Sequence, residues 1–186
     1  METYEAIMTR RSVPKSGEPA PDRVALQRML DAGVRAPNHH LTQPWRFVVL
    51  SGPALKQLGG VWANAVERQG KDGDSVRDKP LRAPTIITVV GRPHRDHPRV
   101  VEIEEYHAIG AAIQNILLAA HDMGFGAMIR TGPAAELPEV LEYLGLEQSE
   151  YVAGFIYVGV PPPGDSDRPM SRRRPASEIT EWRGFS

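Results

Sequence analysis

The stretch Pro84-Thr-Ile-Ile-Thr-Val-Val90 decides the fold of this chain. It is rich in threonine, isoleucine and valine, and its apolar residues do not alternate with polar ones. A run of this kind is typical of a strand that is covered on both faces. The sequence therefore predicts one sheet between two layers of helices, and the segments on either side of this run have to supply those helices.

Helical and strand patterns alternate around the central run. We predict further strands over 45–50, 126–130 and 151–160, and helices over 3–11, 23–36, 53–68, 104–123 and 138–144. Asp22 is placed to cap the second helix, and Pro37 is placed to stop it. The helix over 104–123 carries apolar residues on all sides, which predicts that it is buried all round. Residues 69–83 are predicted to form a surface loop, because glycine and proline are scattered among charges there.

The chain ends in a polar arm, residues 164–186, which follows three consecutive prolines and has little core of its own. Within this arm, residues 175–182 are predicted to form a short amphipathic helix that ties the arm down. A length of 186 residues suits a single domain that carries such an arm.

The composition excludes several kinds of site. The chain has no cysteine, which excludes disulfides, Cys-ligated zinc, a thiolate nucleophile and an iron–sulfur cluster, and no other metal site is predicted. A formal net charge of −1 argues against a surface that grips nucleic acid. No apolar run resembles a signal peptide or could span a bilayer, so we expect a cytoplasmic protein without membrane contact. The glycine-rich dinucleotide fingerprint is missing after the first predicted strand.

Two basic segments could bind an anion. Arg10-Arg11-Ser12 offers guanidinium and hydroxyl donors to a phosphate, although cations at the end of a helix also compensate its dipole without a ligand. Arg172-Arg173-Arg174 is a solvated basic run unless the arm folds back toward Arg10. If it does, the two segments would share one anion.

Two other stretches could surround a flat ligand. Residues 35–45, Arg-Ala-Pro-Asn-His-His-Leu-Thr-Gln-Pro-Trp, gather polar donors, imidazoles and an indole, or else form an ordinary connection anchored by Trp45. Residues 124–132, Gly-Phe-Gly-Ala-Met-Ile-Arg-Thr-Gly, place Arg130 at the end of a strand, where α/β sheets hold ligands. Their glycines allow close approach of a ligand to the backbone, or serve as a helix cap and a turn.

Taken together, these motifs carry a resemblance to a known family. R-R-S near residue 10, A-P-x-H followed by Q-P-W, R-A-P-T-I-I-T-V-V, G-F-G-x-x-x-R-T-G and a late G-x-P occur in this order over residues 1–162. The series resembles the flavin-dependent nitroreductase family, and most of all its small single-domain bacterial NAD(P)H nitroreductases. The resemblance implies an α+β three-layer sandwich with a central mixed sheet flanked by helices. It also implies a homodimer, in which the C-terminal arm reaches the partner subunit.

The resemblance further implies where cofactors bind. FMN would lie in the dimer interface, held by Arg10, Arg11, Ser12, Arg35, His39, Ile129, Arg130, Thr131, Arg172 and Arg174. NAD(P)H would be bound by Ala119, Ala120, His121, Asp122, Met123 and Gly124. Arg130 is the catalytic candidate, because a cation beside the flavin stabilises the negative charge that reduction places there. Where many relatives have Ser-Ser-x-Asn, this chain has Asn38-His39-His40-Leu41, which changes the contacts at the flavin edge.

The predicted function is two-electron reduction of nitroaromatics, quinones or similar flat electrophiles by NAD(P)H, through FMN and by a ping-pong mechanism. One alternative is a different flavin reaction on the same fold, such as dehalogenation, enone reduction or flavin breakdown. Another is a non-enzymatic, arginine-rich module that binds phosphate or nucleic acid. His39, His40 and Tyr106 are the candidates for a proton donor.

Overall fold

Strand β2 (Thr85–Gly91) is buried along its whole length, as the sequence predicts. The computed structural model describes residues 1–96 and 98–185. In it, β2 pairs with β1 (Trp45–Ser51) and β4 (Tyr151–Gly159), and β4 pairs with β3 (Gly126–Arg130). The strand order is β1-β2-β4-β3, so β3 lies at an edge of the sheet.

The pairing direction corrects one expectation. All three pairings between named strands are antiparallel, so the prediction of a mixed sheet is wrong for these strands. The isolated bridge between Ser12 and Ala127 is parallel. The hydrophobic pattern could not settle direction, because a strand covered on both faces is equally apolar in either pairing.

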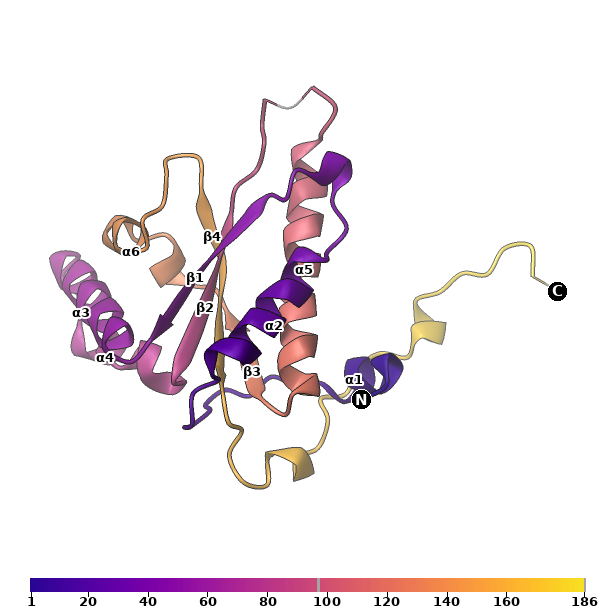
Figure 1. Cartoon of the computed structure of the whole chain (residues 1–186), viewed down its shortest axis with the longest axis horizontal. Coiled ribbons are helices and arrows are strands. Elements are labelled where there is room, and N and C mark those ends of the chain that lie inside the picture. The colour runs from indigo at the N-terminus through magenta and orange to yellow at the C-terminus, as the bar shows by residue number, and fades with distance from the viewer. Residues whose placement is uncertain (97, 186) are drawn as a thin grey trace.

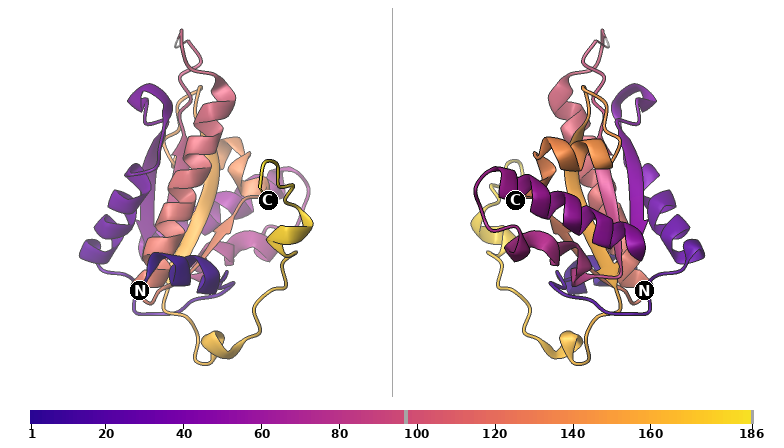
Figure 2. Two further views of the ribbon diagram at one scale, coloured as in Figure 1. Left: turned by 90° about the vertical axis from the view of Figure 1, so that its right-hand side faces the viewer. Right: turned by 90° about the vertical axis from the view of Figure 1, so that its left-hand side faces the viewer.

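Helices cover both faces of the sheet, which confirms the three-layer α+β sandwich (Figure 1; Figure 2). One face carries α2 (Arg23–Val34) and α5 (Glu102–Asp122), and the other carries α3 (Pro53–Arg68) and α6 (Pro138–Tyr143). The remaining helical elements are short: α1 (Thr3–Thr9), α4 (Asp74–Arg77), η1 (His39–Leu41), η2 (Lys79–Arg82), η3 (Pro133–Ala135), η4 (Asp165–Asp167) and η5 (Ala176–Glu178).

The helix ends follow local chemistry. The carboxylate of Asp22 accepts a hydrogen bond from the Ala25 N–H at 2.7 Å, which confirms the predicted cap of α2. Gly33 lets α2 approach α5 closely, since a Cβ at this position would lie 2.9 Å from the Ile116 side chain. The predicted loop 69–83 in fact contains α4 and η2.

Two further expectations fail in the single chain. Helix α5 is buried on one side only, because Ile103, His107, Gly110 and Gln114 form an exposed row along it. Residues 175–182 form no amphipathic helix and contain only the single turn η5. After its contacts with residues 10–12, the arm extends away from the body and ends far from the sheet (Figure 1).

A buried ion pair holds β1 against the turn before β4. The Glu150 side chain is 1% exposed and accepts two hydrogen bonds from the Arg46 guanidinium, at 2.8 and 2.6 Å. This contact with Arg46 lowers the pKa of Glu150 below its ordinary value. The pair therefore stabilises the fold fully above about pH 4.3, the ordinary glutamate value, and less as the pH falls through the lowered pKa.

We expect Glu150→Gln to reduce the free energy of unfolding at pH 7 by about 1.5–3 kcal/mol, the usual worth of hydrogen bonds to a charged group. Urea unfolding of the flavin-free protein at one fixed concentration measures this loss. The difference from wild type should shrink as the pH falls below about 4.3 and through the lowered pKa of Glu150, where the wild-type carboxylate also becomes neutral. Glu147→Gln is the matched control, because the Glu147 side chain is exposed and its ion pair with Arg92 is long, at 3.9 Å. Equal stability of the two variants at pH 7 would contradict the assignment.

Candidate functional site

The segment that leaves α1 lies beside the edge strand β3. The Val13 N–H donates to the Ala127 carbonyl at 3.1 Å, next to the bridge between Ser12 and Ala127. At the end of α1, Thr9 Oγ1 and His121 Nε2 share a hydrogen bond of 2.9 Å. These contacts place residues 10–12 at the junction of α1, β3 and the C-terminal end of α5.

The arm returns to residues 10–12 and forms a small polar hollow with them. The hollow has a volume of about 100 Å³ and is lined by Arg10, Arg11, Ser12, Arg168, Pro169, Met170, Ser171 and Arg173. The Arg11 guanidinium donates to the carbonyls of Asp165 and Arg168, at 2.9 and 2.5 Å. Arg168 in turn donates to the Ser12 carbonyl at 3.1 Å and pairs with Asp165. Arg11 and Arg168 therefore bind the arm to the start of the chain.

Two other arginines of this hollow are free to bind a ligand. Among residues 1–96 and 98–185, the guanidinium groups of Arg10 and Arg173 make no hydrogen bond or ion pair. Burial, and then the charges of Arg10 and Arg11, lower the pKa of His121, so this imidazole adds no third positive charge near neutral pH. Two unpaired guanidiniums beside a serine suit a phosphate.

The arm brings a different arginine to the hollow from those named by the resemblance. Arg173 lines the hollow, whereas Arg172 and Arg174 do not. Arg174 lies 3.7 Å from Glu178 in an exposed pair. The roles of Arg172 and Arg174 remain predictions.

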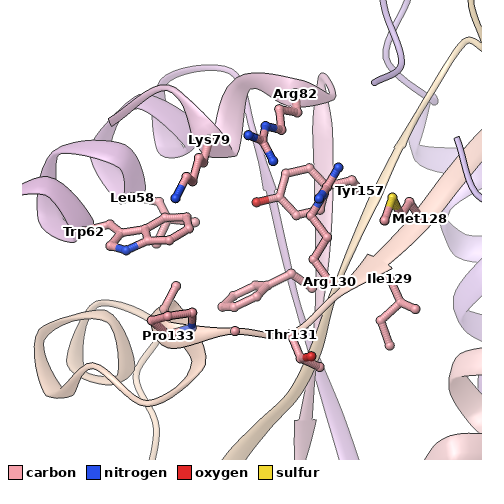
Figure 3. A pocket seen from close by; sticks show the side chains of 13 residues that line it. Leu58, Trp62, Lys79, Arg82, Met128, Ile129, Arg130, Thr131, Pro133 and Tyr157 are labelled. Atoms are coloured by element: carbon pink, nitrogen blue, oxygen red, sulfur yellow. The ribbon is translucent and has the colours of Figure 1, made fainter. Parts of the chain in front are cut away.

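A larger pocket lies where β3 ends, on the face of the sheet that α3 covers. It has a volume of about 370 Å³, within the range of small-molecule sites. Figure 3 shows its aromatic and cationic walls, which are lined by Leu58, Trp62, Lys79, Arg82, Met128, Ile129, Arg130, Thr131, Gly132, Pro133, Ala134, Phe155 and Tyr157. The predicted residues 129–131 therefore share one pocket.

The cations of this pocket have defined positions. The Arg130 guanidinium donates to the Pro14 carbonyl at 2.8 Å and lies 5.4 Å from the centre of the Tyr157 ring. Lys79 Nζ lies 5.1 Å from the centre of the Trp62 ring. Within the described residues, the buried Nε of Arg130 and Nε1 of Trp62 have no hydrogen-bond partner. Orphaned donors in an aromatic pocket suit a flat ligand that carries acceptor atoms.

Residues 10–14 connect the hollow to the pocket. Ser12 lines the hollow, and the Pro14 carbonyl accepts the hydrogen bond from Arg130 in the pocket. Two residues of extended chain cover about 7 Å. A ligand with a phosphate at one end and a flat ring at the other, joined by a short polyol, matches this spacing.

The segment predicted to bind NAD(P)H borders the hollow. Ala120 is fully buried in the core, which leaves it no surface for a ligand. Asp122 pairs with the N-terminal ammonium of Met1 at 2.9 Å, and this contact lowers the pKa of Asp122. Within one chain, residues 119–124 therefore hold the N-terminus and α1, and their role toward NAD(P)H stays a prediction.

Of the other two predicted FMN ligands, His39 lies at the opposite end of α5, whereas Arg35 follows the end of α2 that packs near Asn115 and Ile116. Arg35 caps α2, and His39 Nδ1 lies 3.5 Å from Glu104 Oε2 near the start of α5. His121 lies at the other end of α5, next to Thr9 and Arg10. About 25 Å of helix therefore separates Glu104, which contacts His39, from His121. The structure does not bring His39 and Arg10 together in one chain.

Several pocket residues are not among the candidates predicted from the sequence. Lys79, Arg82 and Trp62 line the pocket although none was a candidate. A signal was present in Lys79-Pro-Leu-Arg82, since two cations three residues apart align on one side of a 3₁₀ turn. Trp62 carried no such signal, because a tryptophan on a helix is usually a core residue.

The described residues lack two kinds of feature. No helix among the described residues is long and apolar enough to cross a bilayer. In the same part of the chain, no cluster of three or more His, Asp or Glu side chains is arranged to hold a metal ion.

Comparisons with known proteins agree with this fold. The model of the nitroreductase family matches residues 7–160. YdjA of Escherichia coli K12, named as an NAD(P)H nitroreductase, is 37% identical over 164 residues, which cover 87% of this chain and 89% of YdjA. A nitroreductase-like protein from Bacillus cereus superposes with a TM-score of 0.84 at 26% identity, covering 100% of this chain and 97% of its own. A protein from Desulfovibrio desulfuricans, named as a nitroreductase and solved in complex with FMN, superposes with a TM-score of 0.77 at 26% identity, covering 98% of this chain and 97% of its own.

Proposed function

This chain belongs to the nitroreductase family, and we propose that it is an FMN-dependent oxidoreductase that takes electrons from NAD(P)H. Its acceptors would be nitroaromatics, quinones or similar flat electrophiles, reduced by two electrons at a time. Since NAD(P)H is an intracellular reductant, the proposed site of action is the cytoplasm.

One observation carries this proposal. The anion hollow at residues 10–12 and the aromatic pocket at Arg130 lie two residues apart along one extended segment. FMN has a phosphate and a flat tricyclic ring joined by a five-carbon chain. When bound, FMN would supply hydride transfer at its ring, a reaction that requires neither a cysteine nor a metal ion from the protein.

Different residues would bind the phosphate and the ring of FMN. Arg10, Arg173 and Ser12 would hold the phosphate, while Arg11 keeps the arm in place through backbone carbonyls. Ile129 and Thr131 would line the ring. Arg130, with Lys79 and Arg82, would place positive charge beside the ring, where negative charge develops during reduction.

A second copy of the chain would complete the site. His39 and Arg10 are about 25 Å apart along α5, which is further than one FMN can span. If α5 packs antiparallel to its twin through the exposed row at Ile103, His107, Gly110 and Gln114, the Glu104 end of one helix lies beside the His121 end of the other. This arrangement would bring His39 of one protomer to the phosphate end of its partner. The dimer would then hold two FMN molecules at its interface.

Binding of FMN tests the phosphate assignment. Arg10→Ala is expected to weaken FMN binding by about 1.5–3 kcal/mol, the usual range for a hydrogen bond to a charged group. Titration of flavin into the apo-protein, followed by flavin fluorescence, gives the affinity, and oxidised FMN should colour the wild-type protein yellow at one FMN per chain. Arg23→Ala removes an equivalent exposed charge outside the hollow and should leave the affinity unchanged. Equal affinities for the two variants would remove Arg10 from the phosphate site.

Steady-state kinetics tests the shared cleft. Because donor and acceptor would use the same flat site, each must leave before the other enters, so double-reciprocal plots with NAD(P)H and a quinone should give parallel lines. Intersecting lines would show that both substrates bind together, and the ping-pong proposal would fail.

A further inference from the structure

The aromatic pocket has a second cationic wall, which is formed by η2. Lys79 and Arg82 enter the pocket from η2, whereas Arg130 enters it from β3. All three side chains are half-buried. Within the described part of the chain, no Asp or Glu lines this pocket. The pocket therefore gathers three positive charges without a carboxylate to balance them.

The two cations of η2 are not used within the protein. Among residues 1–96 and 98–185, the side chains of Lys79 and Arg82 form no hydrogen bond or ion pair. Arg130, in contrast, donates to the Pro14 carbonyl. Lys79 is held only by the face of the Trp62 ring. Because like charges three residues apart on a 3₁₀ turn repel one another, an anion bound between them would lower the free energy of the pocket.

A neutral donor points toward the same two cations. Tyr157 is 4% exposed, and its hydroxyl forms no hydrogen bond to any of the described residues. In Figure 3 this hydroxyl points toward Lys79 and Arg82. Burial raises the pKa of Tyr157 above its ordinary value, so the hydroxyl keeps its proton near neutral pH and serves as a donor. A hydroxyl without a partner in a buried residue costs free energy unless a ligand supplies the acceptor.

An ammonium, a guanidinium and a phenol hydroxyl together suit a carboxylate. Its two oxygens accept about four hydrogen bonds and carry one negative charge. The phosphate of FMN does not compete for this place, because the proposed function puts it in the hollow at Arg10. The ring of oxidised FMN does not compete for it either, because that ring carries no charge. The unpaired cations of η2 therefore fit a charge that another reactant brings into the pocket.

We propose that Lys79, Arg82 and Tyr157 form a carboxylate subsite, so that the preferred acceptors are flat aromatic compounds that carry a carboxylate. Lys79 and Arg82 would pair with the carboxylate, and Tyr157 would donate a hydrogen bond to it. This inference rests on the proposed function, because it takes the acceptor to lie against the flavin ring in this pocket.

The test compares two nitroaromatics that differ in charge. Para-nitrobenzoate carries a carboxylate, and para-nitrobenzamide has nearly the same shape without the charge. The holoenzyme, with FMN saturating, is first reduced and then mixed with each acceptor in a stopped-flow instrument. The wild-type protein should react faster with para-nitrobenzoate. Lys79→Met should lower the ratio of the two rate constants about tenfold, the lower end of the range for a hydrogen bond to a charged group.

This ratio separates recognition of the carboxylate from an effect on the flavin, which would change both acceptors alike. Lys56→Met is the matched control, since Lys56 is an exposed lysine of α3 that does not line the pocket. It should leave the ratio unchanged. If Lys79→Met slows both acceptors equally or slows neither, the proposal is wrong. It is also wrong if the two lysine variants give the same ratio.

The nicotinamide nucleotide is another source of negative charge, because NADPH carries a phosphate on its ribose that NADH lacks, and cationic side chains bind this group in many enzymes. Reduction of the oxidised holoenzyme by NADH and by NADPH distinguishes this source. We expect Lys79→Met to change the two rates by the same factor. A loss with NADPH alone would assign the cations of η2 to the nucleotide, and the carboxylate subsite would be rejected.

A binding measurement gives a readout that does not depend on turnover. Benzoate is a flat anion that this reaction does not reduce, and calorimetry follows its binding to the oxidised holoenzyme. Lys79→Met and Tyr157→Phe should each weaken benzoate binding about tenfold, whereas Lys56→Met should not. Tyr157→Phe keeps the buried ring and removes only the hydroxyl, so it leaves the packing intact. Binding of benzoate to both pocket variants with wild-type affinity would overturn the proposal.

The proposed function can fail separately. If the wild-type protein takes up no FMN, the proposed function fails, and the carboxylate subsite fails with it. If FMN binds and NAD(P)H reduces it, but Lys79→Met shows no selective loss with para-nitrobenzoate, only the inference about the subsite fails.

Discussion

Replacing Arg130 by alanine is expected to slow the reduction of bound FMN by NAD(P)H about 10²-fold, the lower end of the range for losing one donor to developing charge. The lower end applies because Arg130 is half-exposed and a wet site weakens such contacts. Affinity for FMN should fall much less, since the phosphate contacts remain. Stopped-flow reduction with FMN saturating isolates this step.

Two controls separate the charge of Arg130 from its structural contacts. Arg130 also donates to the Pro14 carbonyl, so the variant loosens residues 10–14 as well as removing a charge. Arg130→Lys keeps the charge and should recover most of the rate. Arg82→Ala removes another cation of the same pocket and should have a smaller effect, because Arg130 remains. A wild-type rate in Arg130→Ala would confine this residue to a structural role.

Removing the arm, residues 164–186, should release FMN and dissociate the proposed dimer together. The arm supplies Arg173 to the anion hollow and holds Arg11 and Ser12 through its own backbone and Arg168. Loss of the Arg173 contact, at about 1.5–3 kcal/mol, weakens FMN binding about 10- to 150-fold. The full chain should sediment at twice its 20.5 kDa at micromolar concentration, and the truncated chain at its monomer mass.

A shorter truncation divides the two roles of the arm. Ile179, Trp182 and Phe185 are 67%, 70% and 76% exposed in the single chain, which leaves an apolar surface for a partner to cover. Removing residues 175–186 takes these side chains away but keeps Arg168 and Arg173 at the hollow. This variant should lose affinity between protomers first and bind FMN more tightly than the longer truncation. A full-length chain that sediments as a monomer would rule out the dimer.

The sequence by itself determined the elements whose causes are local. Strand 126–130 and helix 53–68 have the predicted bounds, because glycine and proline mark their ends. Asp22 caps α2 as predicted, since a carboxylate at a helix start can only serve the nearest free N–H groups. The ordered motifs also indicated the family, which the family model confirms over residues 7–160.

Only the tertiary structure decided which charged side chains are free to bind a ligand and which already form hydrogen bonds within the protein. Arg10 and Arg11 are neighbours of identical chemistry, yet Arg11 is bound to the carbonyls of Asp165 and Arg168, more than 150 residues away, and Arg10 is not. Lys79 joins Arg130 in one pocket because α3, η2 and β3 meet there. His39 meets Glu104 because a strained loop returns to α5. Sequence periodicity indicates which face of its own helix or strand a residue occupies. These contacts instead depend on how separate helices, strands and loops pack against one another.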